Sequence, residues 1–116
     1  MFKTFSVLAS LFGILFGGAV AHAKDTQFWN LTENKITKLQ LSQPGKNEWG
    51  ADQTANDSDH TVDADERLKI TDVMPGKYDV RFTDDTQRVC TVRNVLVKLR
   101  EIFSIDEAQL KDACKK

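Results

Sequence analysis

Apolar and polar residues alternate in several short runs along the chain. The clearest run is residues 78–82, where Tyr78, Val80 and Phe82 are separated by single polar residues. Alternation with a period of two is typical of a β-strand that buries one face. We predict further strands from similar apolar runs at residues 27–31, 36–41, 68–71, 88–92, 95–99 and 102–105.

Turn-forming residues separate these runs. Residues 74–76 read Met-Pro-Gly, an order that suits a turn because proline presets the second position and glycine accepts a positive φ. Residues 83–86 read Thr-Asp-Asp-Thr and lie between the runs at 78–82 and 88–92. We therefore predict a β-hairpin from these two runs.

The C-terminal segment departs from the strand pattern. Asp106 is followed three residues later by Gln109, which resembles a capping box at the start of a helix. Leu110 and Cys114 would then share one helical face. We predict a short C-terminal helix that returns Cys114 to the sheet carrying Cys90.

Short strands at roughly ten-residue spacing predict an all-β fold, as a small antiparallel β-sandwich or barrel with that short C-terminal helix. Aromatic and β-branched residues supply its core. Tryptophans in so small a domain usually pack inside. We place Trp29 in the core, whereas Trp49, at the edge of a loop, is open to either a core or a binding role.

The N-terminal residues have the organisation of an export signal. Lys3 precedes an apolar run over residues 5–20, and residues 21–23 read Ala-His-Ala. This order is typical of a cleavable secretory signal. An uncleaved anchor is the alternative, but the run is short for a span of ~20 residues. We predict a signal peptide over residues 1–23 and a single β-rich domain over residues 24–116, located in the periplasm or secreted.

Charge is nearly balanced in the predicted mature domain. The chain has 16 Lys and Arg residues and 17 Asp and Glu residues, and Lys3 is the only one of these within residues 1–23. The mature domain therefore has a net charge of −2 (15 basic against 17 acidic residues). No strong field selects nucleic acid or anionic lipid. We expect no nucleic-acid partner, no membrane span in the mature form, and a monomer.

Two cysteines, Cys90 and Cys114, remain after the signal. An oxidising compartment favours their pairing, and only one intramolecular bridge is possible. Such a bridge contributes about 3 kcal/mol in the chain-entropy model. A zinc site is disfavoured because the cysteines are not closely spaced and His60 is the only histidine after the signal.

The most acidic stretch, residues 55–66, has partial resemblance to a calcium loop. Oxygen ligands at alternate positions suit Ca²⁺. However, Ala55 and His60 stand where a carboxylate and a glycine are expected, and a solvated acidic loop is the simpler interpretation. The candidate ligands are Asp57, Asp59, Thr61, Asp63 and Glu66. We expect no cofactor, with Ca²⁺ at this loop as the alternative.

Catalytic patterns are weak. No serine lies in a nucleophile elbow, and no Ser–His–acid set can be argued around His60. We therefore predict a non-enzymatic binding or structural module of the cell envelope. It would present loops or an edge strand to an unknown envelope protein or ligand.

Several motifs in order carry a family resemblance. They are Asn-Leu-Thr at 30–32, Trp-Gly at 49–50, Tyr-Asp-Val-Arg at 78–81 and a late cysteine. The chain resembles a group of small exported proteins, mostly alphaproteobacterial, whose activity is unknown. The resemblance implies export to the periplasm. Lys77 stands where many members carry a cysteine, so no disulfide pairing is carried over. Residues 76–80 also resemble a strand entry in prealbumin-like sandwiches, an analogy of fold alone.

Overall fold

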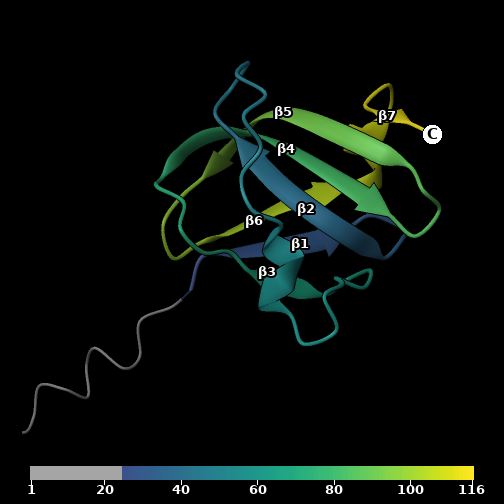
Figure 1. The fold of residues 1–116 in the computed structure, drawn as a ribbon, viewed down its shortest axis with the longest axis horizontal. Helices are drawn as coiled ribbons and strands as arrows, with labels where there is room; N and C mark the ends of the chain where they lie inside the picture. The colour runs from purple at the N-terminus through teal and green to yellow at the C-terminus, as the bar shows by residue number, and fades with distance from the viewer. Residues whose placement is uncertain (1–24) are drawn as a thin grey trace, which may run out of the picture.

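The computed structural model describes residues 25–116, so the predicted signal peptide lies outside the described residues. Strands and two short 3-10 helices alternate with loops (Figure 1). The elements are β1 (Gln27–Leu31), β2 (Ile36–Ser42), η2 (Gln53–Asn56), β3 (Arg67–Lys69), β4 (Gly76–Asp84), β5 (Val89–Val97), β6 (Ile102–Asp106), η3 (Glu107–Leu110) and β7 (Cys114–Lys115). The predicted all-β class is confirmed.

The strands form two sheets, one of order β3-β1-β6 and one of order β2-β4-β5-β7. The larger sheet is antiparallel throughout. In the smaller sheet, β1 pairs antiparallel with β3 and parallel with β6. The parallel pair differs from the purely antiparallel arrangement that we predict from the sequence. β1 and β6 are far apart in sequence, so no tight turn dictates the direction of their pairing.

Side chains from both sheets meet in one hydrophobic cluster. The predicted alternation holds at residues 80–82, because Val80 and Phe82 are fully buried while Arg81 is only half-buried, but it fails at Asp79, which is buried as well. From the smaller sheet, Phe28 and Phe103 pack with ring centroids 5.5 Å apart. Burial of such large apolar side chains contributes about 1.5–3 kcal/mol each. The two sheets are therefore held by a shared core.

The predicted hairpin is confirmed as β4 and β5, but β5 is longer than predicted. The sequence predicts separate strands over residues 88–92 and 95–99, and most of these residues belong to β5. The pairing shifts by one residue where Asp79 of β4 faces the Arg93–Asn94 step. Asn94 has φ 56°, a left-handed conformation that asparagine tolerates. A β-bulge therefore joins the two runs into one strand.

The predicted C-terminal helix is wrong. Its capping box is present, with Asp106 and Gln109 bonded reciprocally, but η3 is a four-residue 3-10 helix that ends at Leu110. Asp112 then takes φ 66°, and the chain enters β7 at Cys114. Short isolated helices are marginal. Here the disulfide and the pairing of β7 with β5 need an extended chain end, which a continued helix would prevent.

The predicted disulfide is confirmed. Cys90 and Cys114 are directly opposite each other in the pair of β5 and β7, and their side chains are joined. The tie fixes the chain end against the larger sheet, near the turn between β4 and β5 (Figure 1). None of the helical segments within residues 25–116 has the length and apolar character needed to cross a bilayer.

The placement of Trp29 in the core is wrong. Phe28 and Asn30 of β1 point inward, so alternation directs Trp29 to the outer face of the smaller sheet, where it is half-buried. Its Nε1–H donates to the Asp65 carboxylate at 3.1 Å, and the Arg67 guanidinium lies 4.6 Å from the ring centroid. These contacts cover part of the ring without burying it in the core.

Candidate functional site

The acidic loop at residues 55–66 uses its carboxylates for local hydrogen bonds. Asp57 accepts from the Asp59 N–H at 2.9 Å, and Glu66 accepts from the Asp63 N–H at 2.7 Å. Asp63 also lies 3.7 Å from Lys35 Nζ. The carboxylates of Asp57, Asp63 and Glu66 therefore each stabilise a turn or pair with a neighbouring side chain.

The middle of the same loop is anchored away from solvent. Val62, next to the half-exposed Thr61, is fully buried and exchanges two 2.9 Å backbone hydrogen bonds with Ile36. Within residues 25–116, no group of three or more His, Cys, Asp or Glu side chains is arranged to hold a metal ion. Ca²⁺ at this loop stays the alternative to the prediction of no cofactor, and a binding measurement decides between them.

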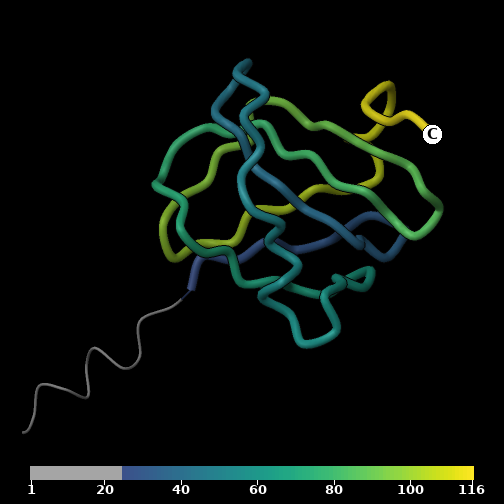
Figure 2. Tube along the Cα trace, in the orientation of Figure 1, coloured from purple at the N-terminus to yellow at the C-terminus, as the bar shows by residue number. Residues whose placement is uncertain are grey.

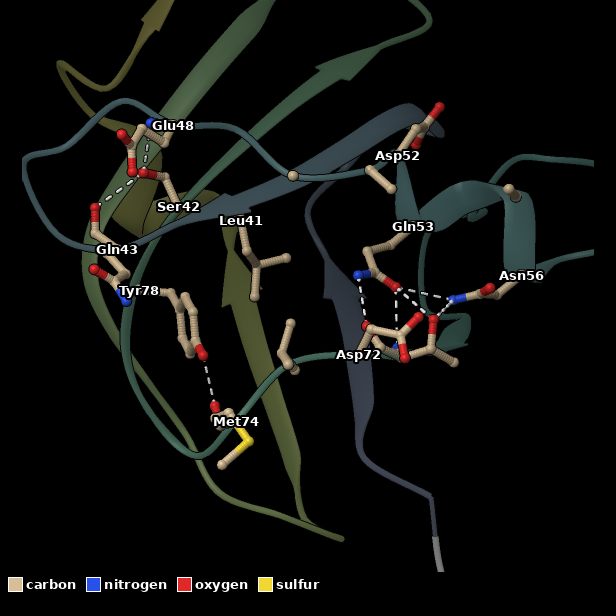
Figure 3. Close-up of a pocket in the computed structure, with 15 residues that line it drawn as sticks. Leu41, Ser42, Gln43, Glu48, Asp52, Gln53, Asn56, Asp72, Met74 and Tyr78 are labelled. Carbon is tan, nitrogen blue, oxygen red and sulfur yellow. Dashed lines mark hydrogen bonds between the residues drawn. The ribbon is translucent and has the colours of Figure 1, made fainter.

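A cleft of about 500 Å³ opens between the loop after β2 and the segment before β4 (Figure 3). Leu41 and Tyr78 supply apolar surface, and Met74 projects at its rim. Gln53 binds the backbone N–H and C=O of Thr71 through its amide, and the Tyr78 hydroxyl donates to the Met74 carbonyl at 2.6 Å. These polar groups therefore bind one another instead of converging on the space of the cleft.

The outer edge of β5 differs from the cleft in that its backbone groups have few partners, because no strand lies beside much of this edge. β4 pairs with β5 from Val89 to Val97, whereas β7 pairs only with Val89 and Cys90. One more bond follows, from the Thr91 N–H to the Ala113 carbonyl at 2.9 Å. No described residue makes a backbone hydrogen bond to this edge beyond Thr91.

Leu96 exposes its backbone at this edge. Hydrogen-bonding direction alternates along a strand. The Asp84 N–H donates to the Arg88 carbonyl, so every second residue of β4 from Asp84 back to Gly76 faces β5. Val95 and Val97 lie opposite Tyr78 and Gly76 and therefore face β4, so the N–H and C=O of Leu96 point away from it. The Leu96 side chain is 52% exposed on the outer face. An unpaired edge of this kind is a template for another strand.

Two adjoining hollows border this edge, and we call them together the β5 groove. It lies between residues 89–96, the first half of β6, and residues 109–115. The hollows measure about 520 and 440 Å³ and share Val92, Arg93 and Gln109. β5 and β6 belong to different sheets and are joined by a short connection (Figure 1). The groove is the space left where the two strands separate.

Asp79 fixes the bulge at the centre of the groove. Its carboxylate is 1% exposed and accepts hydrogen bonds from Gly45 N–H (2.9 Å), Arg93 Nη1 (2.8 Å) and Asn94 N–H (3.1 Å). Burial disfavours the charged form, but these three donors outweigh it and lower the pKa of Asp79. An ionised Asp79 therefore holds both residues of the bulge.

A second network fixes η3 at one end of the groove. Arg88 donates to Asp84 and to Glu107, each at 2.9 Å. Asp84 is fully buried, yet bonds from Thr86 and Arg88 outweigh burial and lower its pKa. The hydrogen bond from Arg88 is the main reason that the pKa of Glu107 is also lowered. The ion pairs of Arg88 with Asp84 and Glu107 therefore join the β4–β5 turn to η3.

The sequence does not predict the β5 groove as a site. The one signal in the sequence is a change in the phase of the apolar–polar alternation at residues 92–95, where Val92 and Val95 are separated by two polar residues. That signal locates a bulge and predicts no free edge. Whether this edge is open depends on where β7 begins, because β7 runs antiparallel to β5, and the alternation does not show that.

The fold and the groove define a two-sheet β protein with an unpaired strand edge. No protein-family model, curated protein or solved structure matches this chain.

Proposed function

We propose that this chain is an exported, non-enzymatic binding module of the bacterial cell envelope that holds a partner by strand addition at the β5 edge. The observation that carries the proposal is the unpaired backbone of β5 beyond Thr91. Extended peptides bind such edges through main-chain hydrogen bonds, while neighbouring hollows select side chains.

Export to the periplasm is supported by the charged, apolar and small-residue order of residues 1–23. The disulfide between Cys90 and Cys114 agrees with an oxidising compartment. The resemblance to small exported alphaproteobacterial proteins points to the same location.

A β-sandwich is the architecture we propose for the domain. The support is that two sheets share one core, to which Phe28 and Ile105 contribute from one sheet and Leu39, Val80 and Phe82 from the other. Two sheets packed face to face leave strand edges at the sides, and the β5 groove lies at such a side.

A binding role is favoured over catalysis because the polar groups of the cleft are already hydrogen-bonded within the protein. In the cleft of Figure 3 the amide of Gln53 and the hydroxyl of Tyr78 are engaged with protein groups. His60 lies exposed in the acidic loop, and neither cysteine is free to act as its nucleophile, because Cys90 and Cys114 are joined in the disulfide.

The proposal is tested by affinity capture from an envelope extract with three baits. These are the mature domain, its Leu96→Pro variant and its Met74→Ala variant. Proline removes the outward N–H of residue 96, whereas Met74→Ala alters the cleft of Figure 3 and leaves the edge intact. We expect the same partner on the wild type and on Met74→Ala, and its loss on Leu96→Pro.

Hydrogen exchange of the captured complex completes the test. Slowed exchange of the Leu96 amide on binding is the expected result. A partner that still binds Leu96→Pro, or that is lost with Met74→Ala, would overturn the strand-addition mode.

A further inference from the structure

We infer that the segment held at the β5 edge is an acidic extended peptide whose carboxylates alternate with aliphatic side chains. This inference rests on the proposed strand addition and adds the chemistry of the partner. It follows from the charges, the exposed apolar residues and the dimensions of the β5 groove.

Basic side chains lie at both ends of the β5 groove. Lys98 lines the hollow next to β6, and Lys111 and Lys115 line the hollow next to β7. None of the three is within ion-pair distance of a carboxylate of the described chain. They are therefore free to meet charges on a partner.

Arg93 adds a fourth cation between these ends. Its Nη1 donates to Asp79 at 2.8 Å, but its side chain is 54% exposed. The groove is lined by four basic residues and by two acidic ones, Glu101 and Asp112. With the ionised Asp79 that pairs with Arg93 included, the balance is four basic against three acidic residues, a local surplus of +1. The chain as a whole has a net charge of −1, so this surplus is local.

The acidic part of the chain lies elsewhere. Residues 52–66 contain six Asp and Glu residues and no Lys or Arg. Figure 2 shows the loop after η2 on the opposite side of the molecule from the C-terminus. Because physiological salt screens charges over ~8 Å, this separation weakens the effect of the acidic loop on the charges of the groove.

Exposed aliphatic side chains mark the end of the groove near Lys98. Leu96 is 52% exposed and Ile102 is 45% exposed, and both line the hollow there. A strand laid beside β5 points alternate side chains to opposite faces. Leu96 and Lys98 are two residues apart and so share the outer face. Carboxylates of the partner on that face can therefore reach Lys98, while the intervening aliphatic residues point into the groove toward Ile102.

The length of the edge limits the segment that can bind. Residues 92–97 of β5 lie beyond the last bond to the β7 segment, a stretch of about 20 Å at ~3.3 Å per residue. A segment of about six residues is thus long enough to pair with the open edge. The bulge at Asn94 interrupts regular pairing and so limits the possible registers.

The test uses three fluorescein-labelled octapeptides in fluorescence-polarisation titrations. One alternates valine with glutamate, and the other two carry glutamine or lysine in place of glutamate. We expect the glutamate peptide to bind at least about tenfold more tightly than the glutamine peptide at low ionic strength, and 0.5 M NaCl to remove most of the difference. The lysine peptide should not bind.

Charge-reversal variants report on the groove without altering the core. Lys98→Glu and Lys111→Glu should each weaken binding of the glutamate peptide several-fold, because both lysines line the groove. Lys46→Glu is the matched control, since Lys46 is exposed in the loop after β2, outside both hollows, and should leave binding unchanged. Thermal melting checks that all three variants remain folded.

The outcomes separate this inference from the proposed function. Equal binding of the glutamate and glutamine peptides, with slowed exchange of the Leu96 amide, would overturn the acidic preference and leave strand addition standing. The acidic preference would also be overturned if no peptide binds while capture from the envelope extract still depends on Leu96. Binding of the glutamate peptide that Leu96→Pro leaves intact would overturn both.

Discussion

Cys114 lies directly opposite Cys90 in the antiparallel pair of β5 and β7, and a disulfide joins their side chains. β7 is only two residues long, so few other contacts hold the chain end to the larger sheet. The disulfide therefore determines how much of the β5 edge is covered.

Replacing both cysteines by alanine is expected to lower the free energy of unfolding by about 3 kcal/mol. Urea denaturation of the wild type and of the Cys90→Ala/Cys114→Ala variant measures this change. The Thr91 amide should also exchange faster, because its acceptor Ala113 is no longer held. Dithiothreitol should destabilise the wild type and leave the variant unaffected. Equal stability of the two proteins would contradict the prediction.

Arg88→Met is expected to destabilise the domain by roughly 3 kcal/mol, because it leaves the fully buried Asp84 carboxylate without its cation. Urea denaturation gives the value, and Lys38→Met, at an exposed position of β2, is the matched control. The double variant Asp84→Asn/Arg88→Met should lose less than the sum of the single losses. Additive losses would mean that the two side chains do not act as a pair.

Acid should destabilise the domain through the same carboxylates. The folded pKa values of Asp79, Asp84 and Glu107 lie below their ordinary values of 3.8, 3.8 and 4.5. A lowered folded pKa contributes stability that is present above the ordinary pKa and is lost as the pH falls through the folded value. Stability should therefore be constant near neutral pH and decline below about pH 4.5. Melting temperatures from pH 7 to pH 2 test this, and Asp84→Asn should flatten the decline.

Two proline substitutions test which backbone N–H groups of β5 face β4 and which face away from it. Leu96→Pro removes an N–H that faces away from β4, and proline is tolerated at such edge positions. Val95→Pro removes an N–H that faces β4 and should cost roughly 1–3 kcal/mol for the lost ladder bond alone. We expect a clearly lower denaturation midpoint for Val95→Pro than for Leu96→Pro. The reverse order would mean that the edge residues are assigned to the wrong side.

Calcium is expected to leave the melting temperature unchanged relative to magnesium at the same millimolar concentration. The Asp57 and Glu66 carboxylates already accept backbone hydrogen bonds, and a calcium site would have to release them. A rise in melting temperature with Ca²⁺ but not with Mg²⁺ would instead establish the ion site, since a ligand that binds the folded state stabilises it. Asp63→Asn and Glu66→Gln would then identify the ligands.

Local patterns in the sequence were sufficient for most of the strands and for the disulfide, although they divided β5 into two runs and predicted a helix in place of β7. Alternation at residues 78–82 predicts β4 because a period of two puts Val80 and Phe82 on the same face. Two cysteines permit a single pairing, so the bridge between Cys90 and Cys114 needed no knowledge of the fold. The capping box at Asp106 and Gln109 likewise marks the start of η3, since its two hydrogen bonds join residues three positions apart.

Only the tertiary structure decided how these elements pair and which groups stay open. The parallel pairing of β1 with β6, the end of the helix at Leu110 and the outward face of Trp29 all depend on contacts between residues distant in sequence. The free edge at Leu96 has the same origin, because an unpaired N–H is defined by the strand that is not beside it. Alternation reports the face to which a side chain points, but it carries no information on which edge of a strand has a neighbour.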